Sequence, residues 1–196
     1  MIPLLICFGV CSLIGMIVGG VSYVLSEQIS YSFTKEFSWS DAQFVGNLLG
    51  GAIGGGLSII PFFGPIFVSF LTGFLSTGIG MHLQNKWEGK NYTKDEILFA
   101  SFANGAISAL AFKFFELIKI PGLTSGKGSY KAISKQISTK FIRGIISSIS
   151  FKTFSKIFTY NLAGTFTGIL CSGLMDAINA NDLLVDFYNR RPLDYF

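Results

Sequence analysis

The run between Asp41 and Lys86 constrains the fold of this chain most, because it contains no charged side chain. As one straight helix, residues 42–85 would be about 66 Å long, roughly twice the hydrocarbon core of a bilayer. A break lies inside the run, where Pro61, Gly64 and Pro65 stop a helix and favour a turn. The run therefore predicts a helical hairpin with arms at about residues 43–60 and 66–84, each long enough to cross a membrane.

Two rows of glycine follow the first arm of this hairpin. Gly46, Gly50 and Gly54 form one row, and Gly51 and Gly55 form the second. Glycines four residues apart share one helix face, and a face without side chains lets another helix approach to backbone contact. These rows predict close helix association. Two uses stay open at this point: self-association of several copies in a membrane, or tight packing of helices within one compact domain.

The composition favours a chain that meets lipid. Hydrophobic residues make up 50% of the sequence and charged residues 13%, and the mean hydropathy is +0.54. A soluble domain carries about 25% charged residues, so this composition excludes a disordered chain and disfavours an ordinary soluble enzyme. Residues 2–25 and 157–175 are also uncharged. Because no segment alternates as a strand does, we predict an all-α, membrane-active domain of four to six helices.

Local signals place several helix ends. Ser38-Trp39-Ser40-Asp41 has the residues of a helix start after a polar interval at 27–41. Thr93-Lys94-Asp95-Glu96 has the order of a capping box, which predicts a helix over about 95–118. Pro121 to Ser129 is rich in glycine and serine and predicts a linker. The linker divides the chain into a hydrophobic, membrane-inserting region (1–120) and a basic C-terminal region (121–196).

The net charge of +4 is unevenly distributed, because residues 117–175 contain basic side chains and no acidic ones. Apolar residues spaced by four within 130–158 predict a basic amphipathic helix. We expect it to lie on anionic lipid, and a connector helix with a solvated basic face is the alternative. Nucleic acid is not an expected partner, since no recognisable reading module is present. The expected lipid contacts are Lys131, Lys135, Lys140, Arg143, Lys152 and Lys156. The positive-inside rule places 86–94 and 113–156 on the cytoplasmic side only if the chain inserts by the usual route, so the topology stays open.

No constellation typical of catalysis or metal binding is apparent. His82 is the single histidine, and a zinc site needs three or four suitable ligands. The segment Gly122–Ser129 departs from a phosphate-binding loop, because its glycine spacing is short and Lys127 precedes a glycine. Asp176, Asp182 and Asp186 do not share one helix face. We therefore expect no enzymatic activity, no metal and no cofactor.

The stretch PGLTSGKGSYKAISKQ at 121–136, followed by Thr139-Lys140 and ISFKT at 149–153, resembles C-terminal regions of Rhs-repeat and LXG-type bacterial polymorphic toxins. The resemblance implies permeabilisation of a competitor's membrane, with the zipper role on the glycine rows defined above. It also implies a cognate immunity protein as partner and the cytoplasmic membrane of the target cell as the site of action. Rhs repeats and an LXG helix do not occur in this sequence.

These observations predict a membrane-permeabilising toxin domain that acts in competition between bacteria through glycine-zipper association. Two alternatives remain open. One is a resident multi-span integral membrane protein, such as an immunity or accessory protein. The other is an enzymatic toxin with an unrecognised site, whose apolar half aids translocation.

Overall fold

The computed structural model describes residues 2–35, 37–60, 63–117, 126–129, 131–132 and 151–190. These residues contain helices and no strand, so the all-α prediction is confirmed. The principal helices are α1 (Ile2–Thr34), α2 (Asp41–Leu57), α3 (Pro65–Trp87), α4 (Lys94–Leu117), α7 (Phe151–Ala177) and α8 (Ala180–Asn189).

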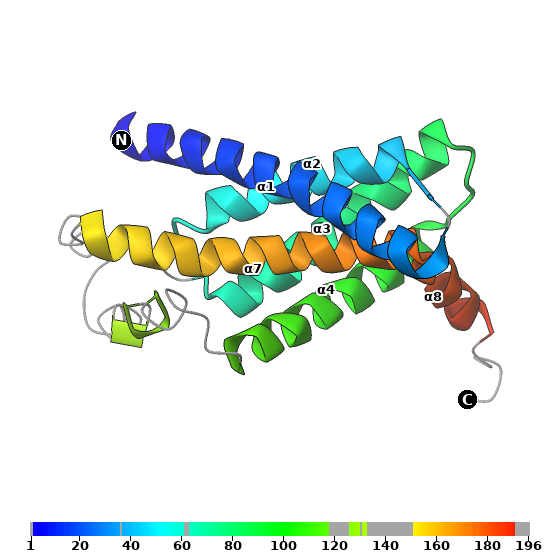
Figure 1. The fold of residues 1–196 in the computed structure, drawn as a ribbon. Helices are drawn as coiled ribbons and strands as arrows, with labels where there is room; N and C mark the ends of the chain where they lie inside the picture. Colours follow the sequence, from blue (N-terminus) through cyan, green and yellow to red (C-terminus); the bar gives the residue numbers. More distant parts are fainter. Residues whose placement is uncertain are drawn as a thin grey trace, which may run out of the picture.

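The long helices form one bundle with α7 near its middle. α7 contacts α1, α2, α3 and α4, and α8 packs against the start of α4 (Figure 1). Consecutive helices from α1 to α4 run in alternating directions, and α7 runs parallel to α1 and α3. α7 belongs to the basic region of the sequence, yet it packs among four helices of the hydrophobic region.

The two ends of the bundle differ in charge. What we call the basic end is where α3 and α7 begin and α4 ends; its described charged residues are Lys113, Glu116, Lys127, Lys131, Lys152 and Lys156. What we call the acidic end is where α1, α3 and α7 end and α8 lies. Its described charged residues are Lys35, Asp41, Lys86, Glu88, Lys90, Lys94, Asp95, Glu96, Asp176, Asp182, Asp186 and Arg190.

The helix starts follow from local hydrogen bonds. Ser40 caps α2, because its hydroxyl accepts a hydrogen bond from the Gln43 amide at 3.0 Å. Glu96 accepts from the Thr93 amide at 2.6 Å and returns its own amide to the Thr93 hydroxyl at 3.3 Å. The predicted helix start at Ser40 and the predicted capping box are therefore confirmed. Pro65 opens α3, where a missing N–H costs nothing.

The bundle has polar side chains inside and apolar side chains outside. Gln43, Asn47, Asn104 and Asn161 are fully buried, whereas large apolar residues such as Phe114 are mostly exposed. Soluble domains show the opposite distribution. Among the described residues, three helical segments are long and apolar enough to cross a membrane: Ile6–Thr34, Pro65–Trp87 and Lys94–Leu117. The chain therefore has the build of a membrane-associated protein.

The structure adds detail to two interpretations of the sequence. Residues 27–34 of the polar interval continue α1, where Glu27 and Ser30 are buried and the Ser30 hydroxyl donates to the Ala177 carbonyl oxygen of α7. The segments 86–94 and 113–156 begin at opposite ends of the bundle, because α4 runs from the acidic end to the basic end between Lys86 and Lys113. If α4 crosses a membrane, Lys86 and Lys113 face opposite sides.

Candidate functional site: the polar interior of the bundle

The first glycine row of α2 lies against α3. A Cβ atom on Gly46 would lie 2.6 Å from the Ser76 carbonyl oxygen, and one on Gly50 would lie 2.1 Å from the Ser76 hydroxyl. A Cβ on Gly54 would lie 2.4 Å from the Thr72 hydroxyl. Real Cβ contacts are essentially never this short. The absence of side chains in this row is therefore what lets α2 and α3 touch.

The second row lies against α1. A Cβ on Gly51 would lie 2.3 Å from the Gly15 carbonyl oxygen, and one on Gly55 would lie 2.3 Å from that of Cys11. Both predicted rows thus contact helices of the same chain. Of the two uses that the sequence left open, close packing within one domain is the one present in this structure.

A chain of hydrogen bonds joins four helices in the half of the bundle nearer the acidic end. The Gln43 amide donates to the Ser172 hydroxyl at 3.0 Å, which lies 3.0 Å from the Thr77 hydroxyl. The Asn104 amide donates to Thr77 at 2.6 Å. These side chains come from α2, α7, α3 and α4, so the polar groups meet at the centre of the bundle.

The chain of polar contacts continues toward the basic end. Ser108 of α4 accepts from Ser69 of α3 through its carbonyl oxygen at 2.8 Å. Deeper along α7, the Asn161 amide donates to the Ser58 carbonyl oxygen at 3.0 Å, and the Ser58 hydroxyl lies 3.3 Å from that of Thr165. Polar side chains therefore follow α7 through most of the bundle.

Five buried amide side chains share one unusual feature. Each donates a hydrogen bond through its NH₂ group, and each leaves its oxygen without a hydrogen-bond partner. They are Gln43, Asn47, Gln84, Asn104 and Asn161. Leaving a buried polar group unpaired costs about 1–3 kcal/mol, so native proteins retain such groups mainly where water, an ion or a function accounts for them.

A polar cavity of about 180 Å³ lies at the acidic end, and Ser40 and Gln84 are among the residues that line it. Gln84 donates to the Asp176 carboxylate at 3.2 Å, and Ser40 donates to Glu88 at 2.7 Å. Burial is the main cause that raises the pKa of Asp176 to about 7, and nearby carboxylates add to it. In the same cavity, Tyr92 donates a hydrogen bond to Asp182. Burial and this carboxylate raise the pKa of the Tyr92 phenol. Acidic groups therefore line this cavity, which we call the acidic mouth.

The basic end carries three of the lysines that the sequence assigned to lipid. Lys131 and Lys152 are exposed and Lys156 is half-buried. Lys135, Lys140 and Arg143, and with them most of the predicted amphipathic helix, lie outside the described residues. Of the predicted turn, Gly64 precedes α3 and Pro65 begins it, and Pro61 lies outside the described residues.

Among the described residues, no three His, Cys, Asp or Glu side chains are placed to hold a metal ion. His82 is exposed on α3. Sequence reasoning missed the buried amides and Glu27, although a signal was present: Gln43 and Asn47 lie four apart in an uncharged run, and Ser22, Ser26 and Ser30 lie four apart around Glu27. Comparisons with protein-family models, with curated proteins and with solved structures each found no match.

Proposed function

We propose that this protein permeabilises a membrane to protons and small monovalent cations along the polar interior of a single bundle. The observation that carries the proposal is the set of five buried amide oxygens without donors, enclosed by helices whose outer faces are apolar. Three of these helices are long and apolar enough to span a bilayer.

The chemistry of the interior favours cations. Uncharged oxygens that lack donors can replace part of a cation's hydration shell, as carbonyl oxygens do in selectivity filters. The acidic mouth formed by Glu88, Asp176 and Asp182 would raise the local cation concentration. Among the described residues, Lys90 is the one basic residue that lines that mouth, and it pairs with Asp182, so anions gain little attraction there.

The setting that we propose is competition between bacteria, with action at the cytoplasmic membrane of the target cell and a cognate immunity protein that protects the producer. The support for this setting is the resemblance of residues 121–153 to polymorphic toxin regions. Self-association in the membrane is not required for conduction through one bundle, because the glycine rows are filled by α1 and α3.

A second candidate is a resident integral membrane protein with an immunity or accessory role. The same filled glycine rows favour it, because a bundle with its helices in backbone contact is well packed as it stands. The two candidates differ in their effect on the cell that makes the protein.

Induced expression in bacteria, followed with a potential-sensitive dye, tests the proposal. We expect loss of membrane potential and growth arrest with the native sequence, and loss of both effects with Gln43→Leu, which removes one buried oxygen. Gln28→Leu is the matched control, because Gln28 is exposed on α1. Unchanged potential at a verified membrane level of the native protein would favour the resident role.

A further inference from the structure

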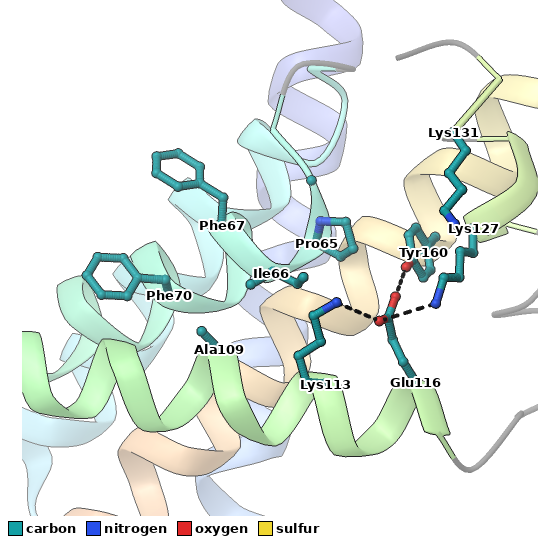
Figure 2. Close-up of a pocket in the computed structure, with 11 residues that line it drawn as sticks. Pro65, Ile66, Phe67, Phe70, Ala109, Lys113, Glu116, Lys127, Lys131 and Tyr160 are labelled. Atoms are coloured by element: carbon teal, nitrogen blue, oxygen red, sulfur yellow. Dashed lines mark hydrogen bonds and ion pairs between the residues drawn. The ribbon is translucent and has the colours of Figure 1, made fainter. Parts of the chain in front are cut away.

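A groove at the basic end, between α3 and α4, has the chemical layout of a phospholipid (Figure 2). It has a volume of about 510 Å³. Its apolar wall is formed by Pro65, Ile66, Phe67, Phe70 and Ala109. Lysines from α4 and from residues 126–132 surround its polar end: Lys113, Lys127 and Lys131.

The polar end of the groove has a surplus of positive charge. The Glu116 side chain, which is only 7% exposed, pairs with Lys113 at 3.3 Å and with Lys127 at 3.4 Å. Tyr160 also donates a hydrogen bond to this carboxylate. Lys131 is exposed and forms no ion pair with a described residue. One carboxylate against three lysines leaves a net charge of two, which complements a phosphate.

The groove lies at the right depth for a lipid. Pro65 begins one candidate span, and Glu116 lies in the last turn of another, so the lysines surround the level where the spans end. Phe70 lies five residues beyond Pro65, which is about 7.5 Å further along the helix axis toward the hydrocarbon. The groove therefore leads from headgroup level to acyl-chain level.

We propose that this groove binds one anionic phospholipid, with its phosphate among the three lysines and an acyl chain along Phe67 and Phe70. A zwitterionic lipid brings its own cation to the lysines and binds more weakly. The proposal depends on membrane insertion of the bundle and not on ion conduction. A negative result for lipid binding therefore leaves the permeabilising activity untouched, and the reverse also holds.

Titration of the full-length protein in neutral detergent with a short-chain phosphatidylglycerol, followed by native mass spectrometry, tests this site. We expect one lipid per protein and weaker binding of the matching phosphatidylcholine. Lys131→Gln is expected to weaken phosphatidylglycerol binding about fivefold, since one surface lysine is lost. Lys86→Gln is the matched control, because Lys86 is an exposed lysine at the acidic end, and it should leave binding unchanged.

Variants of the apolar wall separate a lipid site from a surface that only attracts anions. Ala109→Trp fills the groove and should abolish binding. Phe67→Ala removes a side chain of the same wall that is 44% exposed, and it should weaken binding several-fold. Equal losses from Lys131→Gln and Lys86→Gln, no effect of either wall variant, or full displacement by inorganic phosphate would each overturn the proposal.

Discussion

At the scale of single residues, the fold depends on positions where a methyl group cannot fit. Gly55 is the clearest, because its Cβ would lie 2.3 Å from the Cys11 carbonyl oxygen and 2.7 Å from the Gly15 Cα. Both are backbone atoms of α1, which cannot move aside as a side chain can. The glycine rows therefore fix the distance between helices, and the hydroxyls and amides around them fill the space that remains.

We predict that Gly55→Ala lowers the free energy of unfolding by about 1–3 kcal/mol, the usual cost of overpacking. Gly9→Ala is the control, because nothing lies within 4 Å of a Cβ at Gly9 and alanine favours helix by about 1 kcal/mol. Thermal unfolding in detergent measures both variants. Equal transitions for the two would mean that the contact between α1 and α2 is looser than described.

Asp176 predicts a pH dependence of stability. Its pKa is raised from 3.8 in the unfolded chain to about 7 in the fold, so the folded state binds more protons between these values. Stability contributed by this group is therefore full below about pH 4 and is lost as the pH rises toward 7. In Asp176→Asn, the unfolding midpoint should vary less with pH between 4 and 7 than in the native protein. Asp186→Asn, at an exposed site, should keep the native pH dependence. Equal pH profiles for the native protein and Asp176→Asn would contradict the raised pKa of Asp176.

At the scale of helices, local sequence signals located the elements well. The predicted arms at 43–60 and 66–84 compare with α2 at Asp41–Leu57 and α3 at Pro65–Trp87. Helix starts depend on caps and prolines within a few residues, which a sequence displays directly. The end of α1 did not follow from hydropathy, because hydropathy marks the part of a helix that suits lipid and not the residue where the helix stops.

The sequence alone did not identify which helices pack against one another. The glycine rows indicated that helices would approach α2, but their geometry is the same whether α1, α3 or a second copy fills them. The central place of α7 was hidden for a related reason. Its inner groups, including Asn161, Thr165 and Ser172, are mildly polar, and only the assembled bundle shows that they face other polar groups rather than water.

The course of α4 between the two ends of the bundle predicts opposite sidedness for its flanking lysines. In a background with Cys7, Cys11 and Cys171 replaced by alanine, Lys86→Cys and Lys131→Cys should be labelled by an impermeant thiol reagent from opposite sides of sealed vesicles. Trp87→Cys, adjacent to Lys86 and also exposed, should follow Lys86→Cys. Labelling of positions 86 and 131 from the same side would show that α4 does not span the membrane.

At the scale of the whole molecule, the structure is a helical bundle with polar side chains inside and apolar side chains outside. One of its ends is basic and the other is acidic. Apolar residues cover the outside of α1, α3 and α4, while amides and hydroxyls fill the centre from Asp176 to Asn161. Such an interior is costly in a protein that only needs to be stable, because apolar side chains would pack without unpaired oxygens. We therefore assign the polar interior to function and the glycine rows to holding the helices around it.

Conduction through the polar interior is best tested by ion flux from liposomes reconstituted with the purified protein, measured beside release of a large trapped dye. We predict proton and potassium flux that rises linearly with the protein-to-lipid ratio, without dye release, and that falls at least tenfold in Gln43→Leu but not in Gln28→Leu. Flux equal to that of protein-free liposomes, or equal flux in the two variants, would contradict conduction along this path.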